Sequence, residues 1–186
     1  MYRFGDAPRS RAALFIVSEQ AGFELRRRQR PGEQVTLHFL AAYIAQKGQL
    51  LPGFEPSATM SIRFMTVEGG VTAKVFREFL KRLIAGMDRK IILIVDGHPT
   101  HRARLVKRFV ADNAERLELV FLPPYSPELN PDELVWAHVK KRIAKAASNT
   151  KDALKRTIDR AMRSLQKMPD VVSGFFHAPT CSYANL

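Results

Sequence analysis

The chain has 186 residues, enough for one domain with a sizeable core, and 46% of them are apolar, which excludes a disordered chain. Its 30 lysines and arginines exceed its 18 acidic residues, so the formal net charge is +12. Such an excess often serves solubility, but it also fits a polyanionic partner. The single cysteine, Cys181, excludes an intrachain disulfide and indicates a reducing compartment such as the cytoplasm. No apolar run approaches the ~18 residues of a membrane span, so we expect no membrane partner.

Positive charge is concentrated in three segments of the chain, at 26–30, 101–108 and 140–163. A single basic segment is usually a solvated face, but three in one small domain favour a surface that follows nucleic-acid phosphates. The residues expected to contact DNA are Arg26, Arg27, Arg28, Arg102, Arg104, Lys140, Lys141 and Arg142.

The first third of the chain is expected to contribute strands. Residues 12–17 form a short, mostly apolar run between charged residues, which indicates a buried strand. Residues 34–45 fit a strand or a helix, and the prolines and glycines of 48–60 predict a loop. Residues 61–68 alternate apolar and other side chains, which predicts a strand that the Gly69–Gly70 pair ends.

A helix is predicted after Thr72, whose hydroxyl suits the N-cap position, and Gly86 is expected to end it. Apolar residues recur through this segment at helical spacing. They are Val75, Phe76, Phe79, Leu80, Leu83 and Ile84.

Strands and helices alternate in the second half of the chain. The apolar run 90–96 predicts a strand buried on both faces, and 117–122 predicts the next strand. Between them we expect an amphipathic helix, and after them two helices, at 131–147 and 151–167. The apolar sides of the first and last of these helices contain Leu105, Val106, Phe109 and Val110, and Leu154, Ile158, Ala161, Met162 and Leu165.

This order of elements predicts an α/β fold in which helices flank a mixed sheet. The right-handed crossover rule makes the strands at 90–96 and 117–122 parallel neighbours, or nearly so. The chain shows no internal repeat and no long linker, so we expect residues 1–186 to form a single domain.

Asp96 is expected at the carboxyl end of a buried strand, where ligands bind in open α/β sheets. A carboxylate at this place faces a cleft. The same residue also suits a simpler role, since an aspartate before glycine commonly accepts hydrogen bonds within a turn such as DGHPTH.

Glu133 also has two interpretations. In the segment NPDE, Asn130 fits the N-cap, Pro131 the first helical position and Glu133 the third, which is the layout of a capping box. Alternatively, a helix that packs Trp136 against the sheet turns Glu133 inward, toward Asp96. Two converging carboxylates need a cation or a proton between them, and their hard oxygen atoms suit magnesium or manganese.

The loop FLPPYSPELNP before this helix is rich in proline, which leaves it few conformations to lose on folding. Such a loop would hold Glu133 at a defined distance from Asp96, as a metal site requires. The loop could also be a plain connector, or a ligand for a proline-binding domain, because PYSP fits the P-x-x-P pattern.

The segments VDGHPTH and LPPYSPELNPDELVW resemble the catalytic core of insertion-sequence transposases of the DDE superfamily, bacterial relatives of mariner elements. Between Asp96 and Glu133 lie 36 residues, close to the spacing in that family. RFMTVEGGVTAKVFREFLKRLI also resembles the family's segment before the second acid. The resemblance covers roughly residues 61–176, and the proline-rich motif is its most specific part.

The resemblance implies a ribonuclease-H-like fold and a triad of two aspartates and a glutamate that binds two divalent cations, Mg²⁺ or Mn²⁺. The implied reaction is hydrolytic nicking of DNA at transposon ends, followed by attack of the freed 3′-hydroxyl on target DNA. Asp96 matches the second acid and Glu133 the third. The partners implied are transposon-end and target DNA, and we expect a homodimer in the active form.

The first acid departs from the family pattern. In the matching segment, EQAGF, Glu19 occupies the place of the usual aspartate and Gln20 that of a glutamate. Residues 24–60 do not follow the family's tryptophan-containing pattern, and the chain shows no counterpart of its helix-turn-helix region. We therefore expect a catalytic domain that is truncated or degenerate, with Asp6 or Glu24 as the next candidates for the first acid.

Other residues indicate less specific chemistry. His98 and His101 have a spacing that suits zinc on one helical face, but the sequence offers no thiolate or further histidine nearby. Trp136 and Tyr125 fit packing better than base stacking. Three readings follow: a metal-dependent strand-transfer enzyme, a non-catalytic remnant that binds DNA through charge, and a host nuclease of the same fold.

Overall fold

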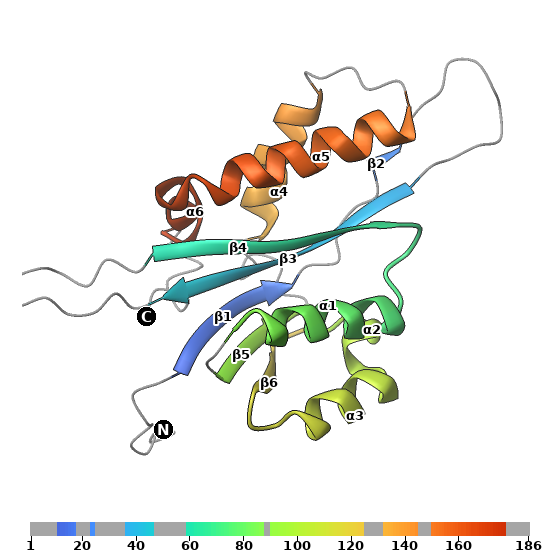
Figure 1. The fold of residues 1–186 in the computed structure, drawn as a ribbon, viewed down its shortest axis with the longest axis vertical. Coiled ribbons are helices and arrows are strands. Elements are labelled where there is room, and N and C mark those ends of the chain that lie inside the picture. Colours follow the sequence, from blue (N-terminus) through green and yellow to red (C-terminus); the bar gives the residue numbers. More distant parts are fainter. Residues whose placement is uncertain are drawn as a thin grey trace, which may run out of the picture.

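The computed structural model describes residues 11–17, 23–24, 36–46, 59–87, 90–124, 132–144 and 150–177. A sheet of six strands lies at the centre, in the order β2-β3-β1-β5-β6, with β4 paired to β3 (Figure 1). The strands are β1 (Arg11–Val17), β2 (Phe23–Glu24), β3 (Thr36–Gln46), β4 (Thr59–Glu68), β5 (Lys90–Val95) and β6 (Leu117–Phe121). The segment 34–45 fitted either kind of element, and its described part, from residue 36 on, is a strand.

The sheet is mixed, as the sequence predicts. β3 is antiparallel to β1 and to β4, whereas β1 is parallel to β5 and β5 is parallel to β6. The carboxyl ends of β1, β4, β5 and β6 therefore lie at one edge of the sheet. The expected parallel pairing of the strands at 90–96 and 117–122 is confirmed.

Two groups of helices cover the two faces of the sheet (Figure 1). α1, α2 and α3 lie on one side, and α4, α5 and α6 lie on the other. Their bounds are α1 (Ala73–Ala85), α2 (Pro99–Arg102), α3 (Arg104–Asp112), α4 (Asp132–Ala144), α5 (Lys151–Gln166) and α6 (Pro169–Phe176). The sequence predicted neither α2, which was taken for a turn, nor α6.

Each helical layer has its own apolar core. On one face α1, β5 and α3 meet around Phe76, Leu93 and Val106, all without exposed surface. On the other face α4 and α5 pack on the sheet around Trp136, Met162 and Ile62. All five residues predicted to face inward from α5 are buried: Leu154, Ile158, Ala161, Met162 and Leu165.

The β5 strand differs from its prediction in one respect. Ile91, Leu93 and Val95 are fully buried beneath the α1–α3 layer, but the alternate residues are only partly buried. Of these, Ile94 packs against the α4–α5 core. Both faces are covered, but unequally, because the α1–α3 layer packs more closely over β5 than the α4–α5 layer does.

The helix caps agree with the local sequence. Thr72 Oγ1 accepts a hydrogen bond from the backbone N–H of Val75, and Gly86 is the C-cap of α1. Thr150 caps α5 through the N–H of Ala153 in the same way. Among the described residues, no helix combines the length and apolar character that crossing a membrane requires.

Candidate active site

Asp96 directly follows the central strand β5, at the edge where the parallel strands end. Val95, the last residue of β5, pairs with Val17 of β1 on one side and with Phe121 of β6 on the other. β1 therefore ends beside Asp96. Glu19, two residues after Val17, lies outside the described residues, as does Asp6.

The Asp96 carboxylate is held by the segment that follows it. Oδ1 accepts a hydrogen bond from the backbone N–H of His98 at 3.0 Å and lies 2.9 Å from Nδ1 of His101. The expected turn-capping role of Asp96 is thus observed. Within the described parts of the chain both contacts fall on Oδ1, which leaves Oδ2 to meet a ligand.

His101 is a buried member of this site. Its side chain has no exposed surface, its ring lies 4.3 Å from the ring of Phe76, and Nδ1 is also 3.3 Å from the Asp96 carbonyl oxygen. Nε2 is buried and has no hydrogen-bond partner among the described residues. Because Nδ1 contacts the carboxylate and the carbonyl oxygen, it carries the hydrogen and donates it.

Opposing effects set the pKa of Asp96. Partial burial raises it, but the hydrogen bonds from His101 and from the His98 backbone, with the nearby histidine charge, outweigh burial and leave the pKa below its usual value. Asp96 is therefore ionised at neutral pH, which is the form that binds metal ions.

Glu133 is the second residue of α4, so the predicted helix start is close to the observed one. Farther along α4, Val135, Trp136 and Val139 are buried against the sheet and α5. Trp136 thus serves packing, as expected, and the Nζ atom of Lys140 lies 5.3 Å from the centre of its ring. The side chain of Glu133 lies outside the described residues, as do Asn130, Pro131 and Tyr125. The inward orientation of Glu133 stays a prediction.

The residues expected to contact DNA are distributed over both helical layers. Arg102 is exposed beside the active-site edge, with its guanidinium 4.5 Å from the centre of the Phe121 ring. Arg104 begins α3, and the three basic residues Lys140, Lys141 and Arg142 lie in the C-terminal part of α4. Arg26, Arg27 and Arg28 lie outside the described residues, and of Glu24 only the backbone, in β2, is described.

The described residues contain no group of three side chains of the kinds that bind metal ions. Of the predicted triad, only the Asp96 side chain is among them. The rings of His98 and His101 are 5.9 Å apart, and the nitrogen Nδ1 of His101 is engaged with Asp96. This arrangement favours a carboxylate partner for His101 over the zinc ligand considered from the sequence.

The sequence belongs to a known family of enzymes. The family described as DDE superfamily endonuclease matches residues 26–155, more than half of the chain, and the chain is therefore a member. The match begins inside the segment 24–60, which lacks the expected tryptophan-containing pattern. The comparison with curated proteins gives no match.

Solved structures show which proteins share the fold. The catalytic domain of Mos1 mariner transposase has a TM-score of 0.56 at 14% identity, over 85% of this chain and 77% of that one. The same Mos1 domain with raltegravir and Mg gives a TM-score of 0.53, also at 14% identity, over 85% and 78%. The catalytic core of BIV integrase has a TM-score of 0.51 at 14% identity, over 82% of each chain.

A chain of the simian T-cell lymphotropic virus intasome in complex with PP2A regulatory subunit B56 gamma has a TM-score of 0.50 at 12% identity. The match covers 85% of this chain but only 50% of the intasome chain. The fold is thus a mixed α/β fold like that of ribonuclease-H-like transposase and integrase cores.

Sequence reasoning missed the contact between His101 and Asp96. His101 lies five positions after Asp96, and only the turn through α2 brings the two side chains into contact. The signal that could have found it was a histidine in the turn after a strand-end aspartate, read as a hydrogen-bond donor and not as a zinc ligand.

Proposed function

We propose that this chain is the catalytic domain of an insertion-sequence transposase, related to the mariner type, that cleaves DNA phosphodiesters and transfers the freed strand. The single observation that supports this most is the position of Asp96, ionised and held at the carboxyl edge of the parallel strands. Membership of the DDE family adds the reaction class. The proposed partners are transposon ends and target DNA, bound by a homodimer.

Asp96, Glu133 and Glu19 would hold two divalent cations, Mg²⁺ or Mn²⁺. Hard carboxylate oxygens are the ligands that these ions prefer, and Oδ2 of Asp96 accepts no hydrogen bond from any described residue. The Mos1 domain, which shares the fold, has a structure with Mg. When bound, the two ions would activate the attacking oxygen and stabilise the leaving oxygen of an in-line displacement.

The chain's own residues would keep the site in order. His101 and the His98 backbone fix one oxygen of Asp96, so the carboxylate cannot rotate freely when the cation binds. His101 is therefore a positioning residue, since it acts through Asp96 and does not touch the substrate. Burial of the His101 ring against Phe76 limits its own motion.

A second candidate function is a DNA-binding remnant that no longer cuts. The observation that favours it is Glu19, which stands where the family has aspartate. The additional methylene moves the carboxylate by about 1 Å or more, and a misplacement of that size can lower a rate ~100-fold.

A nicking assay tests the proposal. The purified chain would be incubated with an uncleaved transposon-end duplex and Mn²⁺, beside Asp96→Asn and Glu133→Gln. We expect each variant to lose activity by ~1,000-fold or more, equivalent to about 4 kcal/mol of transition-state stabilisation. Removing Mn²⁺ with EDTA should abolish the activity of the unaltered chain.

The matched control is Asp112→Asn, which removes one carboxylate at the end of α3 and should leave the rate unchanged. Cleavage that survives both active-site substitutions would refute the proposal. A folded chain that binds DNA but never cuts it would support the second candidate function, a DNA-binding remnant.

A further inference from the structure

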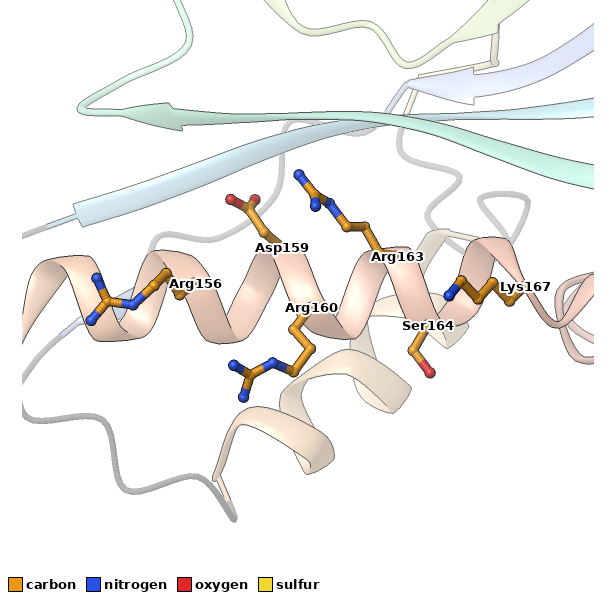
Figure 2. A pocket seen from close by; sticks show the side chains of 6 residues that line it. All are labelled: Arg156, Asp159, Arg160, Arg163, Ser164 and Lys167. Carbon is orange, nitrogen blue, oxygen red and sulfur yellow. The ribbon is translucent and has the colours of Figure 1, made fainter.

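A basic hollow lies on the outer side of α5, in the layer that also contains α4 (Figure 2). Its volume is about 510 Å³, and the described residues that line it come from α5 and the C-cap of that helix. The lining residues are Arg156, Asp159, Arg160, Arg163, Ser164 and Lys167. We call them the α5 basic hollow.

The four cations of the hollow form a row along the helix. Arg156, Arg160, Arg163 and Lys167 follow one another at intervals of three or four residues, which places them on one side of α5. All four are exposed. At ~1.5 Å per residue the row is about 16 Å long, and it therefore spans several phosphates of one DNA strand, which recur every ~3.4 Å along the duplex axis.

Among the described lining residues Asp159 is the acidic member, and it offsets only one of the four positive charges of the row. Asp159 Oδ1 accepts a hydrogen bond of 2.6 Å from the hydroxyl of Thr66, and Figure 2 shows Asp159 pointing toward the strands. None of the four cations forms an ion pair with a carboxylate that the structure describes. By contrast Lys151 and Lys155, in the first two turns of α5, pair with Glu68.

The row is also unfavourable for the helix itself. Like charges one turn apart destabilise a helix, and here three such steps follow one another. The buried side of α5 offsets this cost. The row of cations therefore does not stabilise the fold, and its charge has no partner among the described residues. Such a row fits an external polyanion.

A residue of a second helix, α4, borders the hollow. Arg142, in the last turn of α4, donates from Nη1 to the Ser164 hydroxyl at 3.2 Å. The same α4 carries Glu133 near its start. DNA lying on the hollow would therefore follow the helical layer that supplies the third acid of the proposed triad.

We infer that the α5 basic hollow, continued by Arg142, binds the phosphodiester backbone of duplex DNA without regard to sequence. The proposed function enters only by suggesting DNA as the polyanion. Asp96 is not among the residues that line the hollow, so the hollow would supply affinity for the duplex and take no part in the chemical step.

The test compares two triple variants that remove the same charge from opposite faces. One is Arg156→Gln with Arg160→Gln and Arg163→Gln. The control is Lys74→Gln with Arg77→Gln and Lys81→Gln on α1, whose three cations are also exposed. Glutamine has nearly the helix propensity of arginine and lysine, so both helices should persist.

Binding would be measured by fluorescence anisotropy with a labelled duplex of random sequence, in EDTA, over a series of salt concentrations. For the α5 variant we expect an affinity loss of ~10-fold or more and a slope of log K against log salt reduced by about 3. The α1 variant should keep most of the affinity and most of the salt slope. Replacing the three arginines by lysine should retain the slope, because charge is kept. If the triple variant does not fold, Arg160→Gln alone should reduce the slope by about 1.

Equal losses in the α5 and α1 variants would show that only net charge matters and would overturn the inference. So would an unchanged α5 variant, or a variant that loses binding to vesicles of anionic lipid but not to duplex DNA. Because EDTA removes the metal ions that cleavage requires, the binding result does not depend on the proposed function. If the α5 variant loses DNA binding but the unaltered chain never cuts, only the proposed function fails. If cutting depends on Asp96 but the α5 variant binds normally, only the inference fails.

Discussion

The segment from Asp96 to Arg102 and the outer side of α5 are both rich in ionisable groups. They differ in whether these groups contact an oppositely charged or hydrogen-bonding partner within the protein. In the first segment a carboxylate, a buried histidine and backbone N–H groups contact one another. On α5 four cations lie in a row without an ion pair to any carboxylate in the described parts of the chain.

The difference separates two tasks. Polar groups that bind one another keep a fixed geometry, which a reacting centre requires. Cations without an internal partner keep their attraction for an external anion, which a binding surface requires. Changes in the first region should therefore alter the rate at saturating DNA, and changes in the second should alter affinity for DNA.

Of the variants that test this division of tasks, Glu19→Asp should have the largest effect, and the effect should be a faster cleavage rate. Glu19→Asp should raise the rate of cleavage with Mn²⁺ by up to ~100-fold, because the shorter side chain returns the first carboxylate to the place the family gives it. DNA affinity in EDTA should not change. Single-turnover cleavage and anisotropy on the same duplex measure the two quantities.

Glu19→Ala is the companion variant and should abolish the remaining activity. If the unaltered chain is fully active and Glu19→Ala leaves that activity intact, the first acid is another residue. Asp6 and Glu24 would then be examined next.

Substitution of His101 should have the next largest effect. His101→Leu still fills the space beside Phe76 but removes the donor to Asp96. Partners of metal ligands typically contribute ~10–100-fold to activity or metal affinity. We expect a loss in that range and a higher Mn²⁺ concentration at half-maximal rate.

His101→Asn supplies the matched comparison, because its amide can donate from nearly the place of Nδ1. It should recover part of the lost activity and of the Mn²⁺ dependence. If both variants lose activity in proportion to a lowered melting temperature, His101 acts only through stability, and its positioning role is wrong.

The smallest effect concerns His138 on α4. Burial, and then the charges of Arg142 and Lys141, hold the pKa of His138 below its usual value, so protonation favours the unfolded chain. Its contribution to stability is present above the ordinary pKa of histidine and falls as the pH drops below it. Arg142→Gln should raise the pKa of His138 in an NMR titration. An unchanged pKa would mean that the positive charge of Arg142 does not affect the ionisation of His138.

Much of the fold follows from local patterns in the sequence. The spacing of Leu154, Ile158 and Leu165 predicted the buried side of α5, and Thr72 and Gly86 predicted the ends of α1. Segment 36–46 could not be assigned in advance, because its pairing with β1 and β4 decides it and that pairing is not local.

The sequence could predict a candidate-site residue only where that residue directly follows a helix or strand with a clear pattern. Asp96 was found because it follows an apolar strand. The hydrogen bond from His101 was not predicted, since it depends on the short α2 helix and on the packing of α1 over it. The row of cations on α5 was seen only as basic composition, because the sequence alone does not show which cations have carboxylate partners.

The central claim is that Asp96 and Glu133 bind the same divalent cation. Anomalous diffraction from crystals soaked in Mn²⁺ tests it most directly. The account predicts a peak between Oδ2 of Asp96 and the Glu133 carboxylate, with ligand bonds of ~2 Å. No peak at that place, or two carboxylates more than ~8 Å apart, would contradict the account, since one cation cannot bridge that distance.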